Sequence, residues 1–317
     1  MHPLLSVIIP THAPNPTRFE RTLRGLREQK LPRETWELLV IDNASPEPQF
    51  FSNCDFSWHP SANIIREDRL GLTSARIAGI QASRGDYLVF VDDDNVLCPN
   101  YLEDVIQIFQ QHPELGAIGG KSLPEFEVEP KPWVSQCSGY LALRDLGEEV
   151  QVSSQTRLST KAAPKHYPAF APIGAGMGLL RLAAELYVNQ IAKDNTRLAL
   201  DRTGRSLVSG GDCDIVLTVL DAGWEVGYFP QLKLTHLIPA SRLTKDYLAR
   251  LNRASSRSWV QVLDMHNIRV WQKIPRWTVL PRKIKAFLSY QPWKSTVAYV
   301  RWQGACGMFE GLGELPK

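Results

Sequence analysis

The sequence lacks any apolar run long enough to span a membrane, and its cysteines are too scattered for a disulfide framework. A spanning helix needs about 20 consecutive apolar residues, and no run in the 317 residues approaches that length. The N-terminal segment has no basic leader and no small-residue cleavage site, so we expect no secretory signal. Five cysteines without a C-x-x-C pair favour reduced thiols in a cytoplasmic protein over a zinc site.

The composition is that of a globular protein with an uneven distribution of charge. Hydrophobic residues make up 44% and charged residues 22%, which excludes a disordered chain and allows a large core. The net charge is +3, but five Lys and eight Arg face only two Asp between Ala240 and Trp302. That stretch therefore carries +11 and leaves −8 for the rest of the chain. Five of the nine tryptophans lie in the same stretch, which needs an explanation of its own.

Short apolar runs alternate with amphipathic stretches over the first 120 residues. We expect strands at 4–9, 37–41, 63–66 and 86–91, and helices at 18–29, 73–83 and 100–111. This order predicts an α/β fold, in which a mostly parallel sheet is covered by helices on both faces.

The alternation becomes less regular after residue 120. Residues 121–170 are rich in Pro, Ser and charge and predict an irregular excursion. Beyond it we expect helices at 183–200 and 212–222, and two short strands at 225–229 and 232–236. From about 241 we expect a basic helical segment broken by Pro275, Pro281 and Pro292. The predicted parts of the chain are thus 1–120, 121–240 and 241–317.

Three of the predicted strands end in polar residues that packing does not require. Ligands of open parallel sheets bind at the carboxyl ends of the strands. Those ends read Pro10-Thr11-His12, Asp42-Asn43-Ala44-Ser45 and Asp92-Asp93-Asp94-Asn95. Three consecutive aspartates raise one another's pKa values or bind a cation, and hard oxygen ligands favour Mg²⁺ or Mn²⁺. A simpler interpretation is a solvated acidic turn that caps the next helix, although a cap needs only one Asp.

A second acidic group, Gly210-Gly211-Asp212-Cys213-Asp214, opens the predicted helix at 212–222. One of its carboxylates can act as a general base, and the glycines permit close approach of a substrate. Alternatively, both carboxylates only cap the helix, whose dipole favours negative charge at this end.

Five motifs in this order resemble the inverting family-2 glycosyltransferases, which have the GT-A fold. They read Ser-Val-Ile-Ile-Pro-Thr (6–11), Val-Ile-Asp-Asn-Ala-Ser (40–45), Gly-Leu-Thr-Ser-Ala-Arg-Ile-Ala-Gly-Ile (71–80), Phe-Val-Asp-Asp-Asp (90–94) and Gly-Gly-Asp-Cys-Asp (210–214). The last two fall where that family has its D-x-D and (E/D)-D-x-D motifs. The resemblance covers roughly residues 4–240 and implies a Rossmann-like nucleotide-sugar-binding half, 1–120, followed by an acceptor-binding, catalytic half, 121–240.

On the donor side, the resemblance assigns nucleotide-sugar binding to seven matching residues. Pro10 and Thr11 would line the nucleotide pocket, and Asp42 would hydrogen-bond the base. Two supporting positions and two aspartates complete the set: Glu67, Arg76, Asp92 and Asp93. A purely structural role for Arg76 stays open.

On the catalytic side, the resemblance makes Asp212 the base that deprotonates the acceptor hydroxyl, with Asp214 in support. Asp94 would bind the divalent cation, Mn²⁺ or Mg²⁺, on the donor's diphosphate. His236 would complete the metal or diphosphate site, although a single His in this position is also compatible with a structural role.

The chain departs from the family's pattern at two places. Gly211 stands where members often have Glu before the catalytic Asp. The segment Gly174-Ala-Gly176-Met177 stands where many read Gly-Ala-Asn-Met. These differences affect the identity of the acceptor more than the type of reaction.

The sequence thus predicts a metal-dependent, inverting glycosyltransferase of bacterial polysaccharide biosynthesis. Its donor would be a nucleoside diphosphate sugar, with uridine diphosphate expected from family frequency, and its acceptor a glycan or a lipid-linked glycan. A nucleotidyltransferase acting on sugar phosphates shares such aspartates, but it normally has a glycine-rich, basic loop where this chain reads His12-Ala-Pro-Asn-Pro. A non-catalytic nucleotide- or nucleic-acid-binding protein would use the +11 stretch and leave the acidic strand ends without a role, so we expect no nucleic-acid partner.

The basic C-terminal segment fits two roles. Lys and Arg interleaved with Trp, Phe287, Leu288 and Tyr290 suit a surface lying on anionic lipid headgroups, which would make the protein peripheral at the inner face of the plasma membrane. A helical cover packed on the catalytic part would account for the same residues.

Overall fold

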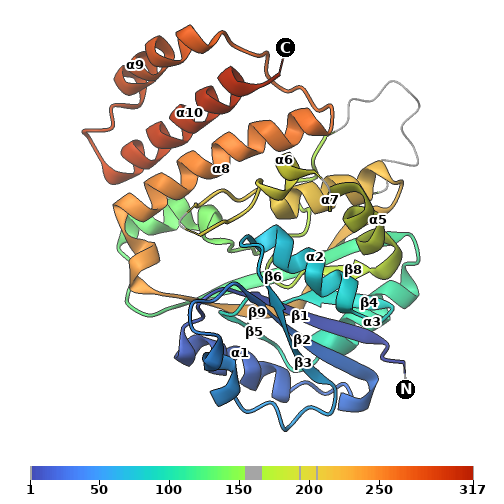
Figure 1. The fold of residues 1–317 in the computed structure, drawn as a ribbon. Coiled ribbons are helices and arrows are strands. Elements are labelled where there is room, and N and C mark those ends of the chain that lie inside the picture. The colour runs from blue at the N-terminus through green and yellow to red at the C-terminus, as the bar shows by residue number, and fades with distance from the viewer. Residues whose placement is uncertain (1, 154–165, 193, 205, 317) are drawn as a thin grey trace.

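The computed structural model describes residues 2–153, 166–192, 194–204 and 206–316, which form an α/β protein around one curled sheet (Figure 1). Four parallel strands make its N-terminal half: β1 (Leu5–Thr11), β2 (Trp36–Asn43), β3 (Ala62–Glu67) and β4 (Tyr87–Phe90). The connecting helices are α1 (Pro16–Arg27), α2 (Leu72–Ala82) and α3 (Tyr101–Gln111). The predicted α/β fold class is confirmed, and every strand and helix expected in this half is present.

The first two strands are buried on both faces. Every residue of β1 and β2 is buried, as expected for parallel strands covered by helices on both sides. Alternate residues of β1 belong to different cores. Ile8 packs with residues of α2 and α5 (Arg181–Ile191), whereas Val7 and Ile9 pack with residues of α1 and α3.

The C-terminal half of the sheet is mixed rather than mostly parallel. The strand order is β3-β2-β1-β4-β8-β6-β9-β5, and β7 pairs with β9 at the side. The added strands are β5 (Asn95–Leu97), β6 (Leu115–Phe126), β7 (Gln151–Val152), β8 (Gly178–Leu180) and β9 (Glu225–Ile238). β8 runs antiparallel to both β4 and β6, whereas β6 and β9 are parallel. The strands β5, β7 and β8 are too short to show a periodicity in the sequence.

The prediction of two separate strands at 225–229 and 232–236 is wrong, because both belong to β9. The register with β6 shifts between Gly119 and Lys121, so residues 229–232 bulge opposite Gly120. A Cβ atom at Gly120 would lie 2.1 Å from the carbonyl oxygen of Leu232. Pro230, which has no N–H to donate, lies in this bulge without interrupting the strand.

Among the described residues, three α-helices follow in the second half, and three more form the C-terminal segment. The first three are α5, α6 (Asn195–Leu198) and α7 (Gly211–Asp221); the last three are α8 (Lys245–Met265), α9 (Val279–Tyr290) and α10 (Thr296–Glu314). The helix predicted at 183–200 ends at Ile191, and Asp194 then caps the short α6. Contrary to the prediction, Pro281 does not interrupt the helix. It lies in the first turn of α9, where the backbone N–H groups have no helical acceptor.

The predicted boundaries near 120 and 240 stay a prediction. β6 crosses the first of them, and a short 3₁₀ helix, η4 (Ala240–Leu243), begins at the second. All five cysteines are free thiols. Among the described residues, none of the helices combines the length and apolarity that a bilayer crossing requires.

One buried histidine in the N-terminal half gives the fold a pH dependence. Burial, first, and the Arg33 guanidinium lower the pKa of His59 from 6.5 to about 4, although Glu34 and Glu37 act in the opposite direction. The unfolded chain therefore binds one more proton at His59 between these pH values. Stability from this group is present above pH 6.5 and declines by up to about 3 kcal/mol as the pH falls toward 4.

We expect His59→Phe, which keeps an aromatic ring against Trp36, to reduce the slope of the free energy of urea unfolding against pH in this range. The same change at exposed His2 should leave the slope unchanged; equal slopes for wild type and His59→Phe would contradict the prediction.

Candidate active site

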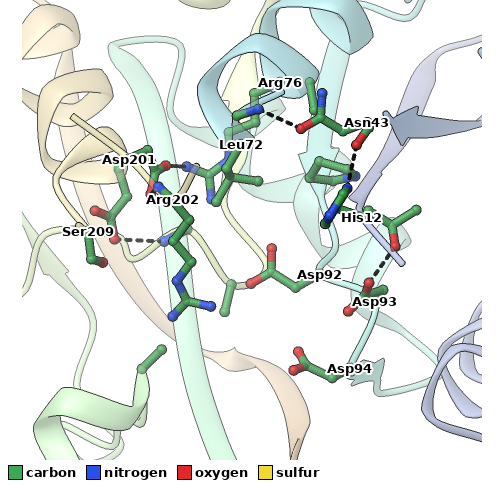
Figure 2. Close-up of a pocket in the computed structure, with 18 of the residues that line it drawn as sticks. His12, Asn43, Leu72, Arg76, Asp92, Asp93, Asp94, Asp201, Arg202 and Ser209 are labelled. Carbon is green, nitrogen blue, oxygen red and sulfur yellow. Dashed lines mark hydrogen bonds and ion pairs between the residues drawn. The ribbon is translucent and has the colours of Figure 1, made fainter. Parts of the chain in front are cut away.

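A pocket of about 270 Å³ lies at the carboxyl ends of β1 and β2 and beside the loop that follows β4. Eight of the predicted site residues line it: Pro10, Thr11, Arg76, Asp92, Asp93, Asp94, Asp212 and His236. Figure 2 shows Asp92, Asp93 and Asp94 together on one side of the pocket and Asp201 with Arg202 on another. Three predicted residues, Asp42, Glu67 and Asp214, lie outside the pocket lining.

The three consecutive aspartates differ in their surroundings. Thr11 donates its hydroxyl proton to the Asp93 carboxylate. Burial, followed by the charge of Asp94, raises the pKa of Asp93 to about 7. Burial also acts to raise the pKa of Asp94, but the hydrogen bond from His236 and the charge of Arg242 outweigh it and hold that pKa well below its usual range. Asp94 is therefore ionised, and the Arg242 guanidinium lies beside it.

Arg242 is a pocket residue that the sequence did not single out. It belongs to η4, directly after β9, and its Nη1 atom lies 3.1 Å from Asp94 Oδ2 and 3.1 Å from His236 Nε2. His236 Nε2 in turn lies 3.5 Å from Asp94 Oδ1, and His236 Nδ1 is buried with no hydrogen-bond partner among the described residues. In the sequence Arg242 was counted only as part of the +11 stretch, because nothing local distinguishes it from a surface arginine.

The donor set around Asp94 suits a hard divalent cation that shares its ligands with a substrate. Within the described ranges, the structure places no three acidic, His or Cys side chains together as a ready metal site. Mg²⁺, however, is commonly bound by one or two carboxylates plus substrate phosphates. Burial, followed by the charge of Asp94, raises the pKa of Asp93, and a cation would favour the ionised form of both carboxyl groups. The residues present therefore fit a cation that binds together with a phosphorylated donor.

Asp212 lies at the N-terminal end of α7 and faces the pocket. Its Oδ2 atom accepts a hydrogen bond of 3.2 Å from the Gly174 backbone N–H, and its Oδ1 atom accepts one of 2.9 Å from the Cys213 backbone N–H. Two backbone donors thus fix the carboxylate at the pocket wall, where an acceptor hydroxyl could reach it.

The predicted partner Asp214 points elsewhere. Its side chain is fully buried and accepts hydrogen bonds from Arg197 Nη2 at 2.7 Å and from His266 Nε2 at 2.9 Å. Burial acts to lower the pKa of His266, but the hydrogen bonds to Asp214 and Asp221 outweigh it and raise that pKa. The assignment of Asp214 as a support of the base stays a prediction, and in this structure its contacts join α7 to α6 and to the end of α8.

A buried ion pair links the two halves of the site. Arg76 Nη1 of α2 lies 3.0 Å from Asp201 Oδ2, and both side chains are almost fully buried. Burial raises the pKa of Asp201 to about 6, although the charge of Arg76 opposes this. Asp201 lies close enough to Asp212 for that carboxylate to raise its pKa further. Sequence reasoning missed Asp201, because it lies in an irregular segment nine residues before the motif that begins at Gly210.

Two glycines make room for this ion pair. A Cβ atom at Gly211 would lie 2.3 Å from Asp201 Oδ2, and one at Gly174 would lie 2.4 Å from Arg76 Nη2. Gly211 is the position where related sequences often carry Glu. Here the carboxylate of Asp201 reaches the same place from another segment, so the acidic character next to Asp212 is retained.

At the end of β2, Asp42 is bonded within the following loop and does not line the pocket. Asp42 accepts hydrogen bonds from the Ser45 backbone N–H at 3.1 Å and from Arg66 Nη1 at 2.6 Å. Burial acts to raise the pKa of Asp42, but these hydrogen bonds outweigh it and lower that pKa. Glu67 Oε1 accepts from the Arg69 backbone N–H at 2.7 Å. The nucleotide-binding roles of Asp42 and Glu67 therefore stay predictions.

Asn43, which the sequence did not assign, is the pocket residue from this strand end. Its amide donates to the carbonyl oxygens of Glu67 and Arg69, and its Oδ1 atom accepts from the Gly71 backbone N–H at 2.7 Å. Asn43 also receives a hydrogen bond of 2.7 Å at its carbonyl oxygen from His12 Nδ1. Asn43 thus positions the loop before α2 through its side chain and the loop after β1 through its backbone carbonyl group.

Comparison with known proteins agrees with the fold. The profile described as "Glycosyl transferase family 2" matches residues 6–162, about half of the chain. An uncharacterized glycosyltransferase of Haemophilus influenzae is 28% identical over 133 residues, 42% of this chain and 44% of that protein. A glucosyl-dolichyl phosphate glucuronosyltransferase of Haloferax volcanii is 27% identical over 117 residues, 36% of each chain. The chain therefore spans less than half the length of these curated relatives.

A solved structure extends the likeness of the fold to almost the whole chain. TarS from S. aureus, residues 1–349, superposes with a TM-score of 0.50 at 12% identity, and the match covers 94% of this chain and 90% of that one. The mixed sheet and the pocket at its strand ends define an α/β protein of the GT-A class. The chain belongs to glycosyltransferase family 2, as its motifs predicted.

The ion pair between Arg76 and Asp201 makes Gly211 sensitive to substitution. We expect Gly211→Ala to lower the free energy of unfolding by about 1–3 kcal/mol, because its methyl group would push the Asp201 carboxylate away from Arg76. Gly139→Ala is the control, since a Cβ atom there would meet nothing within 4 Å. Thermal unfolding of both variants measures the difference, and equal stabilities would contradict the close approach at Gly211.

Proposed function

We propose that this protein transfers a sugar from a nucleoside diphosphate sugar to a hydroxyl group of a glycan or lipid-linked acceptor, with inversion at the anomeric carbon. The observation that carries the proposal is the pair of acidic groups in one pocket: the aspartates after β4 on one side and Asp212 at the start of α7 on the other. Membership of family 2 supports the type of reaction.

The donor would occupy the strand-end side of the pocket. Pro10 and Thr11 line it beside Asp92 and Asp93, and Arg76 stands behind them with its charge balanced by Asp201. Uridine diphosphate is the expected nucleotide, with Asp42 hydrogen-bonding the base and Glu67 supporting the nucleotide. Arg242 and Arg202 also line the pocket, so two guanidinium groups are available to the diphosphate oxygens.

Asp94 would hold Mn²⁺ or Mg²⁺, with Asp92 and His236 nearby. A divalent cation bound with the diphosphate supplies positive charge that stabilises the departing nucleotide. Because Arg242 is paired with Asp94 in this structure, the same carboxylate serves two cations. The Arg242 guanidinium would turn from Asp94 to the diphosphate when the donor binds.

Asp212 would take the proton from the acceptor hydroxyl. The hydroxyl oxygen then forms a bond to the anomeric carbon while the bond to the diphosphate oxygen breaks on the opposite face, which inverts the configuration. The backbone N–H groups of Gly174 and Cys213 hold the Asp212 carboxylate in place for this step. No residue of the enzyme needs to act as a nucleophile.

The proposed setting is bacterial polysaccharide biosynthesis in the cytoplasm, at the inner face of the plasma membrane. A lipid-linked acceptor would be presented at that surface, and an anionic membrane is then a third partner beside the donor and the acceptor.

The donor site is tested by calorimetric titration of uridine diphosphate, with guanosine diphosphate in parallel, in Mn²⁺ and again in EDTA. We expect metal-dependent binding of uridine diphosphate that Asp94→Ala weakens at least about tenfold. Asp86→Ala, at an exposed position outside the pocket, should bind as the wild type does. Preference for guanosine diphosphate would change the donor and keep the enzyme class. Binding of neither nucleotide would overturn the proposal.

The role of Asp212 is tested by Asp212→Asn, which keeps the acceptor atom for the Gly174 N–H but removes the base. Once a donor sugar has been found, we expect its turnover to drop by about 10²–10⁴-fold while the dissociation constant of the nucleotide stays within about twofold. Turnover close to that of the wild type would place the base elsewhere in the pocket.

A further inference from the structure

The helix α9 presents an apolar face to solvent at the edge of the molecule. Leu280, Ile284 and Leu288 recur at intervals of four residues, so they lie on one side of this helix. They are 66%, 55% and 63% exposed, and Trp277, just before the helix, is 79% exposed. The opposite side of α9 carries the only residue that is buried among those described in the helix, Ala286.

Figure 1 shows α9 as the outermost helix, on the side of α8 and α10 away from the sheet. α9 packs mainly on α10, and Gly307 and Gly311 of α10 bring that helix into close contact with α8. The C-terminal cover is thus complete without the exposed side chains of α9. The apolar face is therefore surplus to folding and large for a monomeric surface.

Two sets of cations stand out in this segment. Arg253 and Lys283 both pair with Glu310, and Arg257 pairs with Glu314. These acidic partners lie beyond the stretch counted as +11, so part of that charge is neutralised within the helical cover. A second set lies exposed on α9 and its flanking segments, with no carboxylate partner among the described residues: Arg276, Arg282, Lys285 and Lys294.

An apolar stripe with Lys and Arg nearby and a tryptophan at each end is complementary to the layers of a membrane surface. Leu and Ile side chains insert below the headgroups, Lys and Arg contact anionic phosphates, and Trp rings stay at the boundary. Trp277 at one end of α9 and Trp293 just beyond the other, 59% exposed, stand where such a boundary would lie. A second copy of the chain would instead bring these four cations against one another, which disfavours a symmetric dimer through this face.

We propose that α9, with Trp277 and Trp293 at its ends, is a membrane-binding surface that lies in the plane of an anionic lipid bilayer. The surface is defined by the apolar residues Leu280, Ile284 and Leu288 and by the four exposed cations of α9 and its flanking segments. Membrane binding of this surface does not depend on the reaction at the donor pocket.

The surface also adjoins the acceptor side of the fold. A cleft lined by Trp133, Tyr290 and Arg301 separates the end of α9 from the 3₁₀ helix η3 (Pro132–Leu141). The residue that ends η3, Ala142, lines the donor pocket. One short helix therefore connects the membrane-binding surface to the pocket, which suits an acceptor that arrives on a lipid.

The test is flotation of the full chain with vesicles of phosphatidylcholine, alone or with about one third phosphatidylglycerol. We expect binding to the anionic vesicles that weakens with salt. The double variant Leu280→Ser/Ile284→Ser should bind about 10- to 100-fold more weakly. The matched control is Leu182→Ser/Ile64→Ser, which removes one Leu and one Ile of similar exposure, 62% and 46%, from distant surfaces. It should bind as the wild type does.

A second pair of variants separates charge from apolar insertion. Arg282→Gln/Lys285→Gln should weaken binding to anionic vesicles about 10- to 50-fold and leave the weak binding to neutral vesicles unchanged. Arg24→Gln/Lys30→Gln, at exposed cations on and just after α1, is the control.

Three outcomes would overturn the inference: no vesicle binding by the wild type, equal binding by the α9 variants and their controls, or a dimer in light scattering that the Leu280→Ser/Ile284→Ser variant dissociates. Nucleotide titration of each α9 variant should match the wild type. A failure of membrane binding is therefore distinguishable from a failure of the proposed transfer reaction.

Discussion

The buried ion pair between Arg76 and Asp201 is the contact on which the geometry of the pocket depends. It joins α2, from the half that begins the sheet, to the segment that leads into α7, and it does so between two side chains that are almost fully buried. Removing one partner of such a pair leaves an uncompensated charge in the interior, at a cost of about 3–5 kcal/mol. Gly174 and Gly211 stand against this pair, one at each end. Asp212, between them, is placed by the same packing.

The pocket collects more negative charge than a stable protein would tolerate without compensation. Asp92, Asp93 and Asp94 lie together, and burial, followed by the charge of Asp94, raises the pKa of Asp93 to about 7. Arg242 offsets part of this charge at Asp94. The arrangement is stable without a donor, yet it leaves carboxylates whose charge is relieved further by a cation. A site of this kind favours ligands that bring positive charge with them, such as a metal–diphosphate pair.

The sequence was informative where chemistry and local pattern coincide. Parallel strands end at one edge of a sheet, so the polar residues after β1 and β4 could be expected to meet, and they do. It was uninformative where a residue reaches the site from a segment without regular structure, as Asp201 and Arg242 do. The bulge that joins two predicted strands into β9 depends on close contact with Gly120, which only the neighbouring strand reveals. Motif spacing also suggested a shared role for Asp212 and Asp214, but positions two apart on a helix face different directions.

The C-terminal segment shows why a count of charges does not define a surface. Part of its positive charge is bound to Glu310 and Glu314 inside the helical cover, and Arg242 belongs to the donor pocket. Among the exposed cations that remain is the smaller set on α9 and its flanking segments, where exposed cations and exposed apolar side chains occur together. Packing explains the cations on α8 and the glycines on α10, because both serve the contact between those helices. It does not explain Leu280, Ile284 and Leu288, whose exposure costs free energy in water and which a lipid surface would cover.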